Sequence, residues 1–447
     1  MIVIRMNIRY NSNDIFNFKS MRNIFLISFT LSIAMFVHGQ NINFNNVQIQ
    51  LDKGEFSDVI EILSNFEAKT SLQNDQRAPL FYFLKAQAYQ KLYENNVDID
   101  LYFENSGAAY NKLFEIEKKR NATIYTNQAR PLFDELIEIA VDKAVSFTKT
   151  RNFTEASTML HDIYKIQPDN PDLLYFAASN ATTGKDYDKA LKYYEELRSL
   201  DHTGVRDLFY AKELSSGKQE QFTDKITRDL AIKSGTHSEP SESKTMSRLP
   251  EILKNLSWIY ANKVGDFQKA IAVINEAIPL SPEDNSLLIS KGNYYYQMGD
   301  KDKFLQVMET IVAKDPNDSD AHYNIGVVKQ ENKEIVEARI AFRKVLEIDP
   351  AYLNAAINLS KTYIDEASLL VDKMNLLSDD PSDDKKFESL QAQQIELYKK
   401  SIIVLERISN KHPQSIPVLK QLVGLYSFLG QDTKLEIVKS KLDQLEN

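Results

Sequence analysis

The chain has 447 residues, 26% of them charged, a formal net charge of −9 and no cysteine. The acidic balance excludes the basic surface that nucleic acid requires, and the missing cysteine excludes disulfides, thiolate metal sites and a lipidated cysteine anchor. Only 13 glycines and 13 prolines interrupt the sequence, while 22 tyrosines and 23 phenylalanines supply large side chains, a composition that favours long packed helices.

Residues 21–39 have the composition of a secretory signal peptide. Arg22 gives a positive start, Ile24–Val37 is mostly apolar, and a small residue precedes Gln40, where we expect cleavage. The apolar run is shorter than the about 20 residues that a membrane-spanning helix needs, so we expect an exported protein with no direct membrane insertion after cleavage. Residues 1–20 would then be an upstream extension. A buried first helix is the alternative, but it lacks an amphipathic partner downstream.

Three prolines, Pro282, Pro316 and Pro350, follow one another at intervals of 34 residues. A proline cannot continue a helix and pushes the preceding residue out of the helical region, so each one ends a unit at a fixed place. A period of 34 is the length of a helix-turn-helix unit that cannot bury its apolar face alone. Copies of such a unit must stack into a solenoid.

The best unit runs from Ser319 to Tyr352. Gly326 and Ala338 are small where its two helices would cross, and Phe342 is large where the unit would meet its neighbour. These places resemble the tetratricopeptide repeat family, which implies an all-α, right-handed superhelical solenoid. The resemblance extends over nearly all of residues 40–447, in units that open near Gln40, Pro79, Ile137, Pro171, Glu251, Asn285, Leu353 and Ile416. A non-repeating helical bundle with chance spacing is the alternative.

The period breaks first between the two halves of the chain. We expect an N-terminal solenoid at 40–215, a degenerate repeat and polar linker at 216–250, and a C-terminal solenoid at 251–447. Leu208–Tyr210 would begin a helix, and one apolar stripe would follow, made of Phe222, Ile226 and Leu230. A loop that folds over the concave face is the other interpretation of this segment.

The second break lies in the unit that opens at Leu353. Its closing Pro413 comes 63 residues after Pro350, so about 29 residues are inserted, and their pattern predicts an extended helical hairpin at about 366–398. This arm would reach roughly 20 Å beyond the solenoid and add little to its core. Its leucines either pack against one another within the hairpin or form a surface that binds a partner. Its acidic tip lacks the calcium-loop spacing and predicts a solvated turn, with Asp379, Asp380, Asp383 and Asp384.

Three short segments are similar to a group of exported tetratricopeptide repeat proteins of Bacteroidetes. They are FTDKITRD at 222–229, GTH at 235–237 and DKMNLLSDD at 372–380. This resemblance implies a Gram-negative envelope location, in the periplasm or associated with the outer membrane.

The sequence predicts no catalytic residue, no cofactor and no metal site. The six histidines lack a second ligand at zinc spacing, and the chain has no glycine-rich phosphate loop, no GxSxG motif and no cysteine nucleophile. Paired carboxylates occur where the repeat places solvated helix faces. We therefore expect a protein that binds rather than an enzyme.

The family resemblance implies that the first helix of each unit lines a concave groove. The partner-binding candidates are Ile289, Asn293, Tyr296, Tyr323, Asn324, Val327, Gln330, Asn354, Ile357, Asn358 and Lys361. Asn293 and Asn324 match the amide places of the carboxylate clamp that some family members use. Asn354 and Asn358 stand where that clamp has its basic pair, which favours a more neutral peptide or a folded partner.

The leading hypothesis is a non-catalytic scaffold of the cell envelope that binds a protein or peptide through the groove or the arm. A glycan- or nutrient-uptake component of the outer membrane is one alternative. Such a component would need a lipid anchor, and the absence of cysteine counts against it. A regulatory or catalytic subunit whose partner supplies the active site is another. The sequence gives no indication of the oligomeric state.

Overall fold

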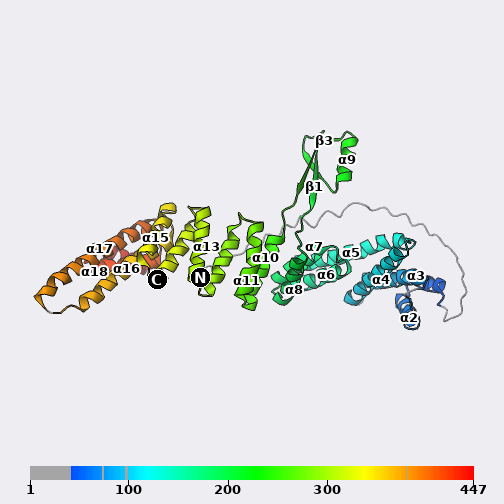
Figure 1. The fold of residues 1–447 in the computed structure, drawn as a ribbon, viewed down its shortest axis with the longest axis horizontal. Coiled ribbons are helices and arrows are strands. Elements are labelled where there is room, and N and C mark those ends of the chain that lie inside the picture. Colours follow the sequence, from blue (N-terminus) through cyan, green and yellow to red (C-terminus); the bar gives the residue numbers. More distant parts are fainter. Residues whose placement is uncertain (1–41, 73–74, 96–98, 379, 447) are drawn as a thin grey trace.

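The computed structural model describes residues 42–72, 75–95, 99–378 and 380–446. Consecutive helices form pairs, and the pairs stack along the long axis of the molecule (Figure 1). The expected signal peptide lies outside the described residues, as does Asp379 of the expected acidic tip. The prediction of a helix-turn-helix solenoid with one extended helical hairpin is confirmed.

Among the described residues, the part of the solenoid that precedes residue 200 contains eight helices. They are α1 (Phe44–Asp52), α2 (Phe56–Glu67), α3 (Ala78–Glu94), α4 (Ile99–Lys119), α5 (Thr126–Lys149), α6 (Phe153–Ile166), α7 (Pro171–Thr183) and α8 (Tyr187–Ser199). The second part contains α10 (Leu249–Ile259) with the π turn η1 (Tyr260–Val264), α11 (Phe267–Ala277) with the 3₁₀ turn η2 (Ile278–Leu280), α12 (Asn285–Gln297), α13 (Lys301–Lys314), α14 (Ser319–Glu331), α15 (Ile335–Ile348), α16 (Leu353–Asn375), α17 (Pro381–Lys411), α18 (Ile416–Phe428) and α19 (Asp432–Glu446).

A glycine and an aspartate make the turn inside two of these pairs. Gly299 lies between α12 and α13 with a φ of +80°, in the left-handed region that favours glycine. The next residue, Asp300, caps α13 by accepting a hydrogen bond from the backbone N–H of Lys303 at 3.1 Å. Gly265 and Asp266 do the same before α11. Each turn therefore starts its second helix at a defined place.

The core follows the repeat pattern. Ala338, Phe342 and Val345 of α15 are fully buried, and α15 ends at Ile348, two residues before Pro350. One continuous core cluster extends from Phe83 in α3 to Tyr294 in α12. The division into two solenoids at 216–250 is therefore no break in the core, because α8 packs directly on α10.

The extended hairpin consists of α16 and α17, which are 23 and 31 residues long. Ala367, Leu370 and Leu397 are buried and share one cluster with Phe342 of the preceding repeat. The expectation that the whole arm adds little to the core is therefore wrong for its base. Leu369 and Leu376, which are 56% and 86% exposed, lie outside this packing.

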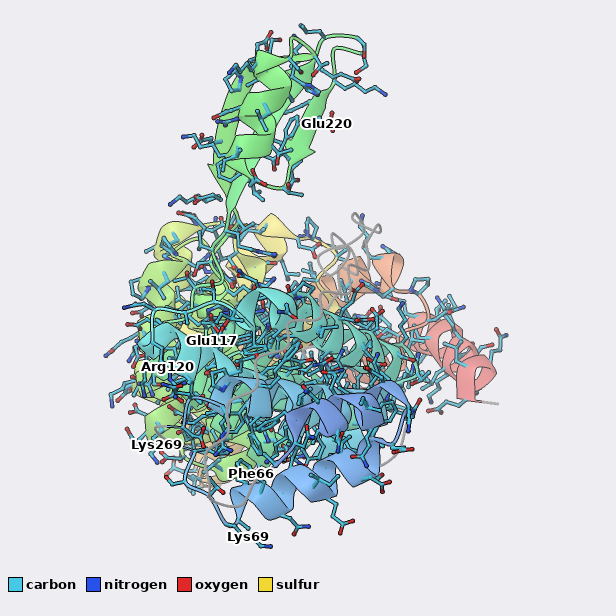
Figure 2. All side chains as sticks on the ribbon, turned by 90° about the vertical axis from the view of Figure 1, so that its right-hand side faces the viewer. Phe66, Lys69, Glu117, Arg120, Glu220 and Lys269 are labelled. Atoms are coloured by element: carbon cyan, nitrogen blue, oxygen red, sulfur yellow. The ribbon has the colours of Figure 1, made fainter. Side chains whose placement is uncertain are left out.

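Between α8 and α10 the chain leaves the solenoid and forms a small β-module, residues 205–248 (Figure 1). Its three strands are antiparallel in the order β2-β1-β3, and its helix packs on one face of the sheet. The module projects away from the solenoid rather than folding over it, as the region around the labelled Glu220 shows (Figure 2). Its elements are β1 (Asp207–Glu213), β2 (Gln219–Phe222), α9 (Lys225–Lys233) and β3 (His237–Lys244).

The expected helix at Leu208–Tyr210 and polar linker at 216–250 are therefore wrong. Gly217, with a φ of +68°, closes a hairpin between β1 and β2. β3 carries almost no apolar side chain and pairs through its backbone, so it leaves no hydrophobic pattern in the sequence. The expected apolar stripe does not form either, because Ile226 and Leu230 are 73% and 61% exposed while Arg228 is buried.

Candidate functional site

The predicted groove residues lie on α12, α14 and α16, the first helices of three successive repeats. None of them is fully buried, and Tyr296, Asn354 and Lys361 are exposed. We call this set the groove strip. Its side chains make contacts between neighbouring repeats that determine which of its polar groups remain available to a ligand.

The hydroxyl of Tyr296 donates a hydrogen bond to Oε1 of Glu331 in the next repeat, at 2.8 Å. Lys301 Nζ lies 2.8 Å from Glu331 Oε2 and lowers the pKa of this carboxyl. The hydrogen bond to Glu331 raises the pKa of Tyr296. Glu331 and Lys301 were not among the predicted residues, yet together they fix the position of the Tyr296 ring.

A second contact joins α14 to α16. The rings of Tyr323 and Tyr352 stack with their centroids 5.2 Å apart, and Nδ2 of Asn358 donates to the hydroxyl of Tyr323 at 3.2 Å. The hydroxyl of Tyr352 donates to Asp320 at 2.7 Å, and burial together with this carboxylate raises the pKa of Tyr352. The amide of Asn358 is therefore already engaged.

The cation of the groove strip is also paired. Lys361 Nζ lies 2.7 Å from Oδ2 of Asp365, one turn along α16. The same carboxylate oxygen accepts a 3.5 Å hydrogen bond from Nε2 of Gln330. A carboxylate clamp needs uncompensated cations, and the groove strip offers none among the described residues.

Three asparagines, Asn293, Asn324 and Asn354, make no side-chain hydrogen bond to any described residue. Asn324 occupies the same repeat place as Asn358, which lies 34 residues later. Asn358 donates its hydrogen bond to Tyr323 in the preceding repeat. The residue at the corresponding place for Asn324 is Ile289, whose side chain has no hydrogen-bonding group. The amide of Asn324 thus keeps its donors and acceptor for a ligand.

A second surface, which the sequence did not predict, lies where the arm meets α18. A shallow pocket there is lined by Gln391, Ile395, Lys399, Phe428, Leu429 and Gln431. The ring of Phe428 is 54% exposed and packs edge-on against Tyr398 at 4.8 Å between centroids. An exposed aromatic beside apolar side chains is a feature of protein contact surfaces.

Within the described part of the chain, no three His, Asp or Glu side chains are placed so that they could hold a metal ion. No helix of the described residues has both the length and the apolar character needed to cross a membrane.

Comparison with known proteins places the part of the groove strip from Ile289 to Gln330 inside a recognised repeat. Residues 289–352 match the family model described as tetratricopeptide repeat. A stretch of 185 residues is 25% identical to Superkiller protein 3 of Schizosaccharomyces pombe, and it covers 39% of this chain and 12% of that protein. The chain thus spans about an eighth of the length of this curated relative.

Several solved structures are similar to parts of the chain. The C-terminal part of a TPR repeat-containing protein from Cytophaga hutchinsonii is 17% identical, with a TM-score of 0.42, covering 68% of this chain and 95% of that one. MamA from Desulfovibrio magneticus RS-1 is 18% identical, with a TM-score of 0.30 and coverages of 52% and 97%. YrrB, described as a TPR protein with an unusual peptide-binding site, is 15% identical, with a TM-score of 0.33 and coverages of 52% and 95%.

Proposed function

We propose that this protein is a non-catalytic interaction scaffold that binds an extended, charge-neutral segment of a partner protein along α12, α14 and α16. The observation that supports the proposal is which polar groups of the groove strip are already paired within the protein and which are not. Its charged residue Lys361 is neutralised by Asp365, and the adjacent Lys301 and Glu331 neutralise each other. The amides of Asn293, Asn324 and Asn354 make no side-chain hydrogen bond to any described residue.

An amide side chain suits a peptide ligand because it presents both donors and an acceptor, which match the C=O and N–H of one peptide group. The exposed ring of Tyr296 beside these amides adds a surface for an apolar side chain of the ligand. A ligand with a net charge would find no free counter-charge on the strip and would lose its hydration without compensation.

The proposal is tested with peptides selected from a random library against the immobilised chain. We expect selected peptides to be neutral at their centre and to bind equally with a free or an amidated C-terminus. Asn324→Ala should weaken binding about tenfold, because it removes a hydrogen-bonded amide worth roughly 1.4 kcal/mol. The matched control is Asn317→Ala in the exposed turn before α14, which should bind as the unchanged chain does.

A requirement for a free C-terminal carboxylate would contradict the proposal, because it would mean that a clamp forms after all. Equal binding by Asn324→Ala and Asn317→Ala would place the site elsewhere. The arm surface around Phe428 is the second candidate, and a loss of binding on Phe428→Ala alone would assign the partner to the arm.

We also propose that the scaffold acts in the cell envelope after export. The support is the sequence pattern of residues 21–39, with its charged start and apolar run before Gln40. N-terminal sequencing of the native protein from an envelope fraction should begin at or near Gln40. A cytosolic protein that begins at Met1 or Met21 would contradict this localisation.

A further inference from the structure

The β-module has two faces, and the register of its strands shows which side chains share each face. Phe209 pairs with Phe222 on β2 and with Glu242 on β3, and residues paired in this way lie on the same side of a sheet. Arg228 of α9 lies over the ring of Phe209 and 3.0 Å from Glu242. The face that contains Phe209 is therefore the one that α9 covers.

The opposite face carries Tyr210 at its centre. Tyr210 pairs with Gln221 on β2 and with Ser241 on β3, and Ser243 lies one same-face position along β3. Gln221, Ser241 and Ser243 are exposed and Tyr210 is partly exposed. Because α9 is the one described helix that packs extensively on the sheet, this face stays open. We call it the open face.

The polar groups of the open face are mostly unused. The hydroxyl of Tyr210, the amide of Gln221 and the hydroxyl of Ser243 make no side-chain hydrogen bond to any described residue, whereas Gln219 donates to Ser241 at 3.2 Å. The ring of Tyr210 has no ring neighbour among the described residues. An aromatic ring is thus surrounded by free amide and hydroxyl groups.

The charges near the open face are compensated. Lys212 lies 3.2 Å from Glu239, and the remaining members of the face are serines, glutamines and one leucine. On the other side of the sheet, His237 lies 2.8 Å from Glu220. On the strands themselves, from Leu208 to Lys212 and their pairing partners, every described cation of the open face has a carboxylate partner. Arg206, at the base of this face, is near enough to Asp172 for its charge to help lower the pKa of that carboxyl.

The edges of the sheet are poorly suited to an added partner strand. β3 contains Pro240, and Glu239 has a φ of +50°, which interrupts its outer edge. Just before β2, the backbone carbonyl of Lys218 points inward and accepts a 2.8 Å hydrogen bond from the backbone N–H of Glu213. By alternation only Gln219 and Gln221 direct their backbone groups outward, which leaves too short an edge for strand addition.

We propose that the open face binds a neutral carbohydrate chain. The ring of Tyr210 would be the platform, because the C–H face of a sugar carries small positive charges that match the negative face of an aromatic ring. Sugar hydroxyls both donate and accept, as do the amide of Gln221 and the hydroxyl of Ser243. This site is independent of the groove strip.

The base of the module holds this face in a fixed direction. The backbone N–H of Arg248 donates to the carbonyl of Thr203 at 2.6 Å, and Arg206 and Thr245 exchange hydrogen bonds across the same two chains. The guanidinium of Arg248 lies 4.6 Å from the ring centroid of Tyr175 in α7. A bound glycan would thus have a defined position relative to the solenoid.

The test is affinity electrophoresis of the purified chain in native gels that contain one polysaccharide each. The neutral probes are soluble starch, mixed-linkage β-glucan, xylan and mannan, and the anionic control is alginate. We expect at least one neutral polysaccharide to slow the chain severalfold and alginate to have no effect. Tyr210→Ala and Gln221→Ala should abolish the retardation, and Tyr210→Phe, which keeps the ring, should retain most of it.

The matched control is Ile226→Ser, which changes an exposed side chain on α9 at the covered side of the module. It should leave the retardation unchanged. The proposal is overturned if no neutral polysaccharide slows the chain, if alginate slows it equally, or if Ile226→Ser abolishes the retardation, which would place the polysaccharide on the α9 side of the module and not on the open face. If Tyr210→Ala lowers the melting temperature, its loss of retardation could come from a folding defect. The result for Gln221→Ala, which changes an exposed side chain, then decides whether the open face binds the polysaccharide.

Discussion

Gly326 of α14 lies directly against the ring of Phe342 of α15, so close that a Cβ atom on Gly326 would stand 2.6 Å from Cε1 of the ring. Phe342 is fully buried and cannot move aside freely. Gly326→Ala should therefore destabilise the protein by about 1–3 kcal/mol through overpacking. Thermal unfolding followed by circular dichroism measures this as a lower melting temperature.

The control for this change is Gly424→Ala in α18. A Cβ there would meet nothing within 4 Å, so the substitution gains helix propensity of about 1 kcal/mol and should raise the melting temperature slightly. If both variants melt alike, the close approach of the two helices is not what requires glycine at residue 326.

Ala338→Arg should destabilise the solenoid more strongly. Ala338 is fully buried between the helices of its repeat, so a long cation must clash or lie unpaired in the core, at a cost of about 3 kcal/mol or more. Ile340→Arg, two residues further on at a side chain that is 61% exposed, should melt nearly as the unchanged chain does. Equal melting of the two variants would show that the repeat register is wrong.

The base of the β-module should show a dependence on pH through Asp172. Burial alone would raise its pKa, but the hydrogen bond from His202 at 3.0 Å and the charge of Arg248 outweigh burial and lower the pKa. A lowered pKa means that Asp172 stabilises the fold above the pKa of the unfolded chain, and that this stability is lost as pH falls through the folded value.

We therefore expect Asp172→Asn to destabilise the protein by about 1 kcal/mol at pH 7. The difference from the unchanged chain should shrink as pH falls from about 4, the pKa of an unfolded aspartate, toward the lower folded pKa of Asp172, below which this group is protonated in both states. Asp169→Asn, at an exposed site three residues earlier, should make no difference at either pH. A difference for Asp172→Asn that is undiminished at pH 3 would contradict the assignment of this stability to its charge.

The arm should tolerate shortening only at its tip. Replacing residues 376–386 with a short Gly-Ser turn keeps Leu370 and Leu397 in their cluster with Phe342, and the melting temperature should stay nearly unchanged. Replacing residues 367–395 removes buried side chains, among them Ala367 and Leu370, and should lower it by several degrees. Equal stability of the two variants would show that the base of the arm is not part of the core.

The prolines and small residues were sufficient to predict the helical repeats, because each acts within one unit. The β-module was not predictable in the same way, since β3 pairs through backbone groups and leaves no apolar pattern. The groove strip was predictable as a set of positions only. Its contacts, such as Tyr296 with Glu331, join residues 35 apart, and their pairing depends on how neighbouring repeats stack.

The direct packing of α8 on α10 also determines how the molecule would carry a mechanical load. Tyr194 accepts a hydrogen bond from Asn255 at 3.2 Å, and Arg198 bonds to Glu276 at 2.6 Å, so the repeats on both sides of the β-module are joined without it. Tension along the solenoid would pass through these contacts and not through the sheet. A partner bound to the module would stay attached while the repeats stretch, until the contact between α8 and α10 itself separates.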